Sequence, residues 1–111
     1  MKFNALDIID IPELIQGCKK RHQNIPFCEV HDCVVRSGVI HGEFHWHKHD
    51  AEGDFFYVIN GLLHVDIQNK TVNLRSGQGI IVLRAANHRI KALERTAVMM
   101  IESWTVTSIE N

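Results

Sequence analysis

Three histidines, His45, His47 and His49, alternate with other residues in a run that also contains Phe44 and Trp46. In an extended strand, alternate side chains leave by the same face, about 6–7 Å apart along the chain. Two such imidazoles can converge on one metal ion, with metal–nitrogen bonds of about 2.0–2.1 Å. The run therefore predicts a metal site. The alternative is a solvated strand face or a tag-like run, but a tag would lie at a terminus and would lack the apolar strand that follows here.

The ligand types indicate a class of ion and leave its identity open. Neutral imidazole suits zinc, iron, copper and nickel, and a carboxylate such as Asp54 keeps manganese and non-haem iron(II) possible. We therefore expect one divalent metal ion as the cofactor, with zinc, iron, manganese and nickel not distinguished.

Length and composition predict a single domain over residues 1–111. The chain has 111 residues, is 45% hydrophobic, and carries a formal net charge of −1, which suits one compact core. Its longest basic run is Lys19-Lys20-Arg21, so we expect no nucleic-acid partner. Without an apolar stretch of signal-peptide or membrane-spanning length, we also expect no membrane partner and a cytoplasmic location.

The cysteines fit that location. Cys18, Cys28 and Cys33 are an odd number and lack Cys-x-x-Cys spacing, which argues against a disulfide framework and a thiolate zinc site. We interpret them as small, mostly buried apolar residues in a reducing compartment, and a reactive thiol is the alternative.

The first 27 residues predict a short helix and a lead-in segment. Asp10 can cap a helix over about residues 11–16, with Pro12 in its first turn, Glu13 three residues after the cap, and Gly17 as its stop. The polar residues 19–24 predict a loop, and β structure is expected from Phe27 onward.

The remainder predicts an all-β sandwich or barrel, because short β-prone runs recur with turn signals between them. Residues 55–59 form one such run, and Asn60-Gly61 is a two-residue turn signal before the alternating residues 62–67. This pattern predicts a β-hairpin. Near the C-terminus, we expect a short strand over residues 89–93, a turn at Glu94-Arg95, and a long last strand over residues 96–106.

Two motifs resemble those of the cupin superfamily, in particular its small single-domain bacterial members with the RmlC-like jelly roll. His47-x-His49, four residues, Asp54, six residues, Gly61 follows the first cupin motif, with aspartate in place of the usual glutamate. The motif's leading glycine has no match at the right spacing. Gly77, five residues, Leu83-Arg84-Ala85, two residues, His88 follows the second motif, with Leu83 and Ala85 in place of proline and glycine and without its final asparagine. The resemblance covers about residues 28–104.

The resemblance implies a cupin-type jelly-roll β-barrel, with the barrel part over about residues 28–106. It also implies one divalent metal held by His47, His49, Asp54 and His88. Three neutral nitrogens and one carboxylate leave open positions on a six-coordinate ion, as a catalytic site requires. Aspartate is one methylene shorter than glutamate, so direct ligation is expected more firmly for the histidines than for Asp54.

Other residues are candidates for the wall of the site. His45 shares the face of His47 and His49 and could act as a general base or a substrate contact. Its alternative role is that of a core histidine bonded to the backbone. His41 and Glu43 are weaker candidates, and His64 should face outward. The expected pocket-wall residues are Phe56, Val58 and one of two adjacent methionines, for which we take Met99.

An outward row of Phe55, Tyr57 and Ile59 predicts a homodimer, because a small monomer rarely leaves such a row in water. Three functions remain open. The first is a metal-dependent enzyme acting on a small organic molecule, as an oxygenase or as an isomerase, cyclase or lyase. The second is a non-catalytic small-molecule-binding or sensor protein. The third is a metal-stabilised structural protein. We favour the enzyme, although fold resemblance alone does not decide among them.

Overall fold

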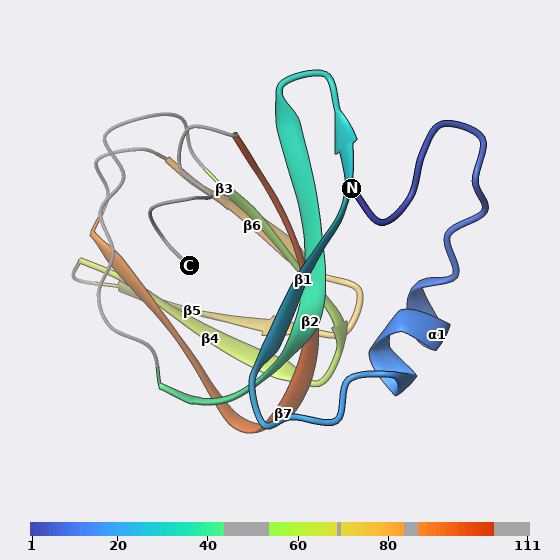
Figure 1. The fold of residues 1–111 in the computed structure, drawn as a ribbon. Helices are drawn as coiled ribbons and strands as arrows, with labels where there is room; N and C mark the ends of the chain where they lie inside the picture. The colour runs from blue at the N-terminus through green and yellow to red at the C-terminus, as the bar shows by residue number, and fades with distance from the viewer. Residues whose placement is uncertain (44–53, 69, 84–86, 104–111) are drawn as a thin grey trace.

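The computed structural model of the chain describes residues 1–43, 54–68, 70–83 and 87–103. The described part consists of α1 (Ile11–Gln16), β1 (Gln23–Val30), β2 (Cys33–Glu43), β3 (Asp54–Asn60), β4 (Leu62–Ile67), β5 (Lys70–Arg75), β6 (Gly79–Val82) and β7 (His88–Ser103). Figure 1 shows α1 beside β1 and β2, with the remaining strands on the far side of that pair. No helix among these residues is long and apolar enough to cross a membrane.

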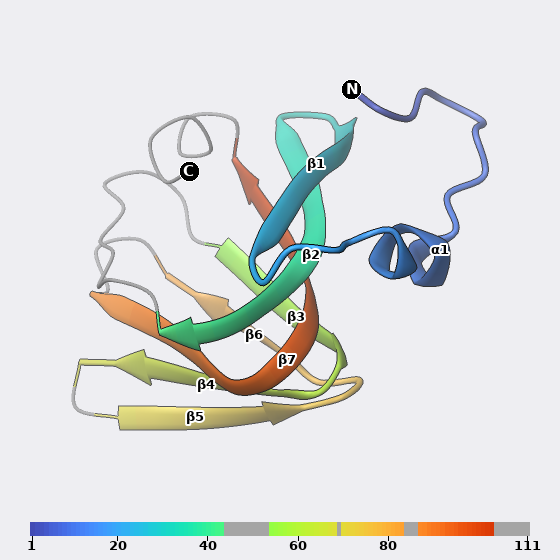
Figure 2. The same cartoon turned by 60° about the horizontal axis from the view of Figure 1, so that its bottom comes forward.

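The strands form two layers that share β7. One layer has the order β1-β2-β7-β3-β6, and β7 also pairs with β4, which in turn pairs with β5. Strand β7 curves strongly, so its first residues join the β4–β5 layer and its later residues join β2 and β3 (Figure 2). All pairs in the described part are antiparallel. This arrangement is the jelly roll that the sequence predicted.

The predicted N-terminal helix is confirmed. Helix α1 spans Ile11–Gln16, and the carboxylate of Asp10 accepts a hydrogen bond from the backbone N–H of Glu13 at 3.1 Å. Pro12 occupies the first turn, where its missing N–H costs no helical hydrogen bond. A few local residues therefore determine this element.

The first strand begins earlier than predicted. Strand β1 starts at Gln23 rather than near Phe27, because Gln23 and Ile25 pair with Val39 and Ser37 of β2. It lies at the edge of its sheet, where Pro26 is tolerated. Pairing with an apolar partner strand thus overrides the polar composition of residues 19–24.

The predicted hairpin at Asn60-Gly61 is wrong. Strand β3 pairs with β6 and β7, and β4 pairs with β5 and β7, so the turn carries the chain from one layer to the other. Gly61 has a φ of +120° and lies against Thr96, where a Cβ would come within 2.7 Å of Oγ1. Glycine is needed here for a close crossing, which gives the same sequence signal as a hairpin.

The predicted turn at Glu94-Arg95 is also corrected. Strand β7 continues through it, and its register with β2 shifts between the pairs Ile40↔Thr96 and Gly42↔Ala92. Three β7 residues, 93–95, therefore lie opposite His41 alone. Such an irregularity bends a strand without ending it, which allows β7 to serve both layers.

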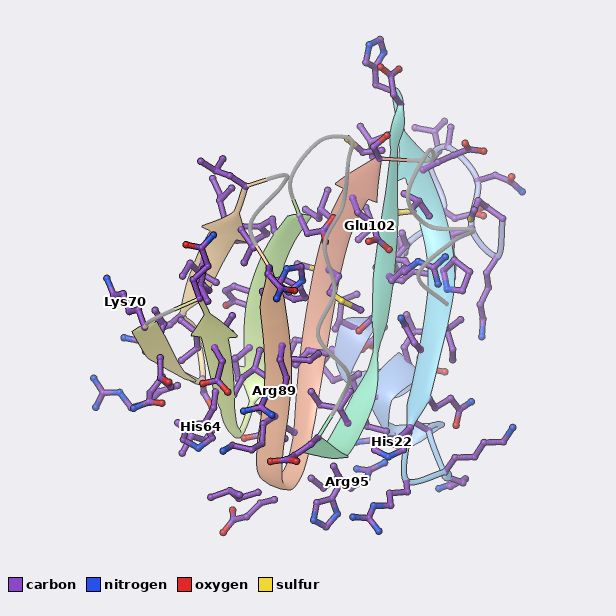
Figure 3. The ribbon with its side chains drawn as sticks, turned by 90° about the vertical axis from the view of Figure 1, so that its left-hand side faces the viewer. His22, His64, Lys70, Arg89, Arg95 and Glu102 are labelled. Carbon is purple, nitrogen blue, oxygen red and sulfur yellow. The ribbon has the colours of Figure 1, made fainter. Side chains whose placement is uncertain are left out.

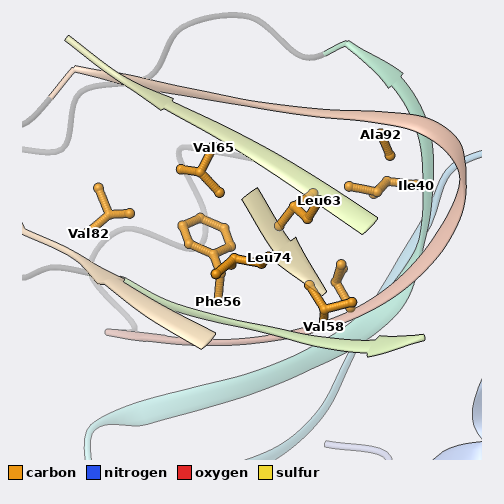
Figure 4. Close-up of a cluster of buried hydrophobic side chains, with 9 residues drawn as sticks. Ile40, Phe56, Val58, Leu63, Val65, Leu74, Val82 and Ala92 are labelled. Carbon is orange, nitrogen blue, oxygen red and sulfur yellow. The ribbon is translucent and has the colours of Figure 1, made fainter. Parts of the chain in front are cut away.

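The main core lies between the layers. It is formed by Ile40, Phe56, Val58, Leu63, Val65, Leu74, Val82, Ala92 and Val98 (Figure 4). Leu63 and Val65 point inward, so His64 takes the outward face of β4, as predicted. A second cluster of Cys18, Val39 and Ala97 lies on the outer face of the larger sheet, with Ile15 of α1 packed against it.

Candidate metal centre

Two of the four predicted metal ligands fall within the described residues. Asp54 is the first residue of β3 and His88 the first of β7, and they expose only 3% and 2% of their surface. His47 and His49, and the candidate base His45, lie outside the described residues. Within the described ranges, no group of three or more potential ligand side chains comes together. The set of His47, His49, Asp54 and His88 therefore stays a prediction.

Asp54 and His88 reach the interior from opposite layers. Asp54 pairs with Val82 on β6 and precedes Phe56 by two residues, so its side chain shares the face of the core. His88 pairs with Ile67 on β4, and its ring lies edge-on to the ring of Phe56, with centroids 5.9 Å apart. Phe56 thus contacts the His88 ring and shares its strand face with Asp54.

The donor chemistry of these two residues fits a divalent ion. A carboxylate oxygen and an imidazole nitrogen are ligands that zinc, iron, manganese and nickel accept. Asp54 directly follows residues 44–53 in the sequence, and that segment contains the other two predicted ligands, His47 and His49. The described part thus supplies two suitable donors with the apolar surroundings that strengthen metal–ligand electrostatics.

The expected wall residues divide between the interior and the outer face. Phe56 is 4% exposed and Val58 fully buried, and both belong to the main core. Met99, by contrast, pairs with Tyr57 and Ser37 on the outer face, and Met100 packs against the core. Of the two methionines, Met100 is therefore the interior residue, which corrects the choice of Met99.

His41 and Glu43 lie on the last part of β2. His41 Nε2 is 3.2 Å from the carbonyl oxygen of Leu93, and Glu43 has one carboxylate oxygen 4.0 Å from Lys91 Nζ. Both contacts join β2 to the early part of β7, and Glu43 is largely exposed. The described geometry thus gives them structural contacts at the strand bend.

A buried ion pair is the functional candidate that the sequence reasoning missed. Arg36 Nε lies 2.9 Å from Glu102 Oε1, and the two side chains expose only 6% and 8% of their surface. Glu102 lies between β7 and β2, away from Arg89 and His64 (Figure 3). The sequence did contain one signal for this pair. Arg36 lies two residues after the buried Val34, so the two side chains leave the strand by the same face.

Comparison with known proteins identifies the fold family. The family model described as "Cupin domain" matches residues 35–104, more than half of the chain. This chain belongs to the cupin family. The match includes Asp54 and His88, and it spans the strands on which the candidate centre is built.

Individual relatives agree with the family assignment. This cupin is 32% identical over 85 residues to the uncharacterized protein YdbB of Bacillus subtilis, covering 76% of this chain and 75% of that protein. A cupin-2 domain protein from Shewanella frigidimarina superposes with a TM-score of 0.83 at 22% identity, covering 86% and 94% of the two chains. Protein NMB1881 from Neisseria meningitidis gives 0.78 at 18% identity, covering 87% and 99%. At these identities, the two structures support the fold alone.

Proposed function

We propose that this cupin is a divalent-metal-dependent enzyme acting on a small organic molecule, as an oxygenase or as an isomerase, cyclase or lyase. His47, His49, Asp54 and His88 would hold the ion. The observation that carries the proposal is the burial of Asp54 and His88 in the interior, although the two residues come from separate motifs and opposite layers.

Residues of this chain would bind the ion, exclude water from it and contact the substrate. Asp54 and His88 would supply an oxygen and a nitrogen donor, and the Phe56 ring would keep water from one side of the site. When bound, a divalent ion there would polarise a substrate oxygen or, as iron(II), support oxygen chemistry. His45 would act as a general base or a substrate contact near neutral pH. The three free cysteines fit a cytoplasmic location, which we retain as part of the proposal.

Metal analysis of protein purified without chelator tests the site. We expect about one divalent ion per chain, and its loss in His47→Ala and His88→Ala, because each removes a neutral nitrogen ligand. His64→Ala is the matched control, since His64 lies on the outward face of β4 and should keep the ion. If a variant that lacks both His47 and His49 still bound the metal, the ligand assignment would be wrong.

Activity measurements test the enzymatic part. We expect oxygen consumption with candidate substrates in the iron(II) form, or isomerase, cyclase or lyase turnover in another metal form. His45→Ala should keep the metal and reduce turnover. Tight metal and ligand binding without turnover in any metal form would instead support the sensor function.

We also propose a homodimer formed through the outer face of the larger sheet. Cross-strand pairing places Val35, Ile101, Phe55 and Ile81 in one row across β2, β7, β3 and β6. The next row contains Ser37, Met99, Tyr57 and Gly79. These two rows carry no charged side chain, and Ile81 is 65% exposed. An uncharged apolar face fits a second copy of itself.

Two details of the predicted row change. Ile59 packs against the cluster of Cys18, Val39 and Ala97, so it does not extend the outer row. Ile81, which the sequence reasoning did not include, takes its place beside Phe55. The proposed interface thus lies toward β6 and away from the part of the sheet near α1.

The mass of the protein in solution tests the dimer. We expect twice the chain mass of 12.7 kDa by light scattering, and a monomer for Ile81→Glu, because a buried unpaired carboxylate opposes association. Leu93→Glu is the matched control, since Leu93 is 69% exposed but lies at the β7 irregularity. A monomeric wild type, or equal effects of both variants, would exclude this interface.

A further inference from the structure

Residues 4–9, which lead into α1, form a loop that carries two apolar side chains into solvent. Leu6 and Ile8 expose 101% and 91% of their surface, whereas no other large apolar side chain in the described part exposes more than 70%. Figure 1 shows this loop in dark blue, clear of the barrel and on the side of β1 and β2 that carries α1. Helix α1 packs on the outer face of the larger sheet, so the loop stands beside that same face.

The loop is fixed at both of its ends. Before it, the backbone N–H of Phe3 donates to the carbonyl oxygen of Phe27 on β1 at 2.9 Å, and the two rings meet edge to face with centroids 6.3 Å apart. After it, Asp10 caps α1. Within it, the N–H of Asp7 donates to the carbonyl oxygen of Asn4 at 3.1 Å, and the N–H of Asn4 donates to Asp7 Oδ2 at 2.8 Å. The exposed side chains thus stand on a closed turn.

The backbone at Leu6 gives no local reason for a leucine. Leu6 is the third residue of the turn over residues 4–7 and has a φ of +71°, where glycine and asparagine are favoured and a leucine is strained. Its full exposure means that its side chain gains nothing from packing within its own chain. Strain of this kind is typical of residues with a binding role.

The two uncharged rows on the outer face are too small to hold a dimer by themselves. They cross four strands about 4.8 Å apart and take two side-chain positions on each, an area of roughly 250 Å². A standard interface buries about 800 Å² on each partner. The loop adjoins these rows, because its anchor Phe27 lies between the β1 residues that are opposite Arg36 and Val35. It is therefore placed to enlarge the interface.

Two-fold symmetry brings the loop of one copy to the sheet edge of the other. A copy turned by 180° about an axis parallel to the strands places its β6 over β2 and its β3 over β7, and it keeps the strands aligned, as packed sheets do. Strand β6 of the second copy then lies beside β1 and its loop. Ile81 and Leu83 are 65% and 70% exposed and alternate with the buried Val82, so they point from that edge toward the facing copy.

We propose that Leu6 and Ile8 bind Ile81 and Leu83 of a second copy, so that each loop clasps the β6 edge of its partner. The proposal rests on the homodimer proposed above and adds to it the orientation of the two copies and the contribution of the loop. It is independent of the metal and of the enzymatic activity.

The dimer dissociation constant of Leu6→Asn, measured by analytical ultracentrifugation on the full-length protein, tests the loop contact. Asparagine suits the positive φ and Leu6 has no packing contact to lose, so the melting temperature of the monomer should not fall. The dissociation constant should rise by about tenfold or more, because two leucine side chains per dimer lose their burial. Leu93→Asn is the matched control, since Leu93 is 69% exposed at the β7 irregularity and should leave the constant unchanged.

Cross-linking tests the orientation without weakening the dimer. Leu6→Cys protein and Leu83→Cys protein are mixed, allowed to exchange subunits and oxidised, and peptide mass spectrometry should find a disulfide between positions 6 and 83. A mixture of Leu93→Cys and Leu83→Cys should give no link between positions 93 and 83. A disulfide between two copies of Leu6→Cys would instead show that the loops meet each other, which contradicts this orientation.

The outcomes separate this proposal from the dimer on which it rests. An unchanged dissociation constant in Leu6→Asn, together with loss of the dimer in Ile81→Glu, would overturn the loop contact and keep the interface on the sheet. A monomeric wild type would overturn both. Neither result bears on the metal site, because metal content and turnover are measured separately.

Discussion

At the scale of single residues, Asp66 shows how the fold changes the properties of one carboxylate. The hydroxyl of Thr71 donates to Oδ1 at 2.6 Å, and Arg89 donates to Oδ2 through Nη2 at 2.8 Å and Nε at 3.1 Å. The hydrogen bond from Thr71 and then those from Arg89 lower the pKa of Asp66 below its ordinary value of 3.8. The charged form of Asp66 is therefore favoured by folding.

Asp66→Asn should destabilise the protein in a pH-dependent way. Because the folded pKa is lowered, the contribution of Asp66 is fully present above its unfolded pKa of roughly 3.9 and is lost as the pH falls through the folded value. The melting temperature of Asp66→Asn should therefore lie below that of the wild type at pH 7, and the difference should shrink below about pH 4. Thermal unfolding from pH 2.5 to pH 7 measures this.

Thr71→Val is the control for the hydrogen bond from Thr71, which is the largest cause of the lowered pKa of Asp66. It removes the hydrogen bond to Oδ1 and keeps the Arg89 pair, so it should show a smaller difference with the same pH dependence. If the melting temperatures of the wild type and Asp66→Asn differed by the same amount at pH 3 and at pH 7, the pH dependence could not be assigned to Asp66.

At the scale of elements, the connection from β3 to β4 depends on Gly61. A Cβ at this position would lie 2.7 Å from Thr96 Oγ1 and 3.0 Å from Thr96 Cα. Thr96 is fully buried, and its hydroxyl donates to the carbonyl oxygen of Leu62 at 3.0 Å. The chain therefore passes from one layer to the other across a contact that has no room for a side chain.

Gly61→Ala should lower the free energy of unfolding by about 1–3 kcal/mol, through strain at positive φ together with the contact to Thr96. Gly77→Ala is the matched control, because Gly77 also has a positive φ, +86°, but its Cβ would meet no atom within 4 Å. Urea denaturation of both variants measures the difference. Equal losses would mean that backbone strain alone is responsible.

At the scale of the whole molecule, the candidate metal would join the two layers. Asp54 belongs to β3 in the larger sheet, whereas His88 begins β7 beside β4. An ion that binds only the native state raises the free energy of unfolding by RT ln(1 + [M]/Kd), about 2.7 kcal/mol at a hundredfold excess over Kd. Stabilisation by metal should therefore extend to the whole cooperative unit.

Zinc added to chelated protein should raise the melting temperature by several degrees, in proportion to that free energy. His88→Ala should abolish the rise, because the β4–β5 layer then contributes no ligand to the proposed set, and His64→Ala should retain it. Differential scanning calorimetry measures the shift. A rise of the same size in His88→Ala would place the stabilising ion elsewhere.

The sequence by itself determined features that depend on neighbouring residues. Asp10, Pro12 and Gly17 determined the helix, because capping satisfies backbone groups within one turn. The alternation of Leu63, His64 and Val65 determined which side chains of β4 face the core, because the strand period is two. The motif residues also sufficed to predict the cupin fold that the family match established.

Only the tertiary structure decided how the strands pair and which residues meet. The glycine at position 61 suits a hairpin and a crossing equally well, and the choice depended on pairing with β7. The β2–β7 irregularity opposite His41 likewise shows only in the paired register, and the pairing with Tyr57 and Ser37 placed Met99 outside the core. Arg36 and Glu102 meet only because β2 and β7 lie side by side, since local sequence carries no information about the strand on which a charged side chain finds its partner.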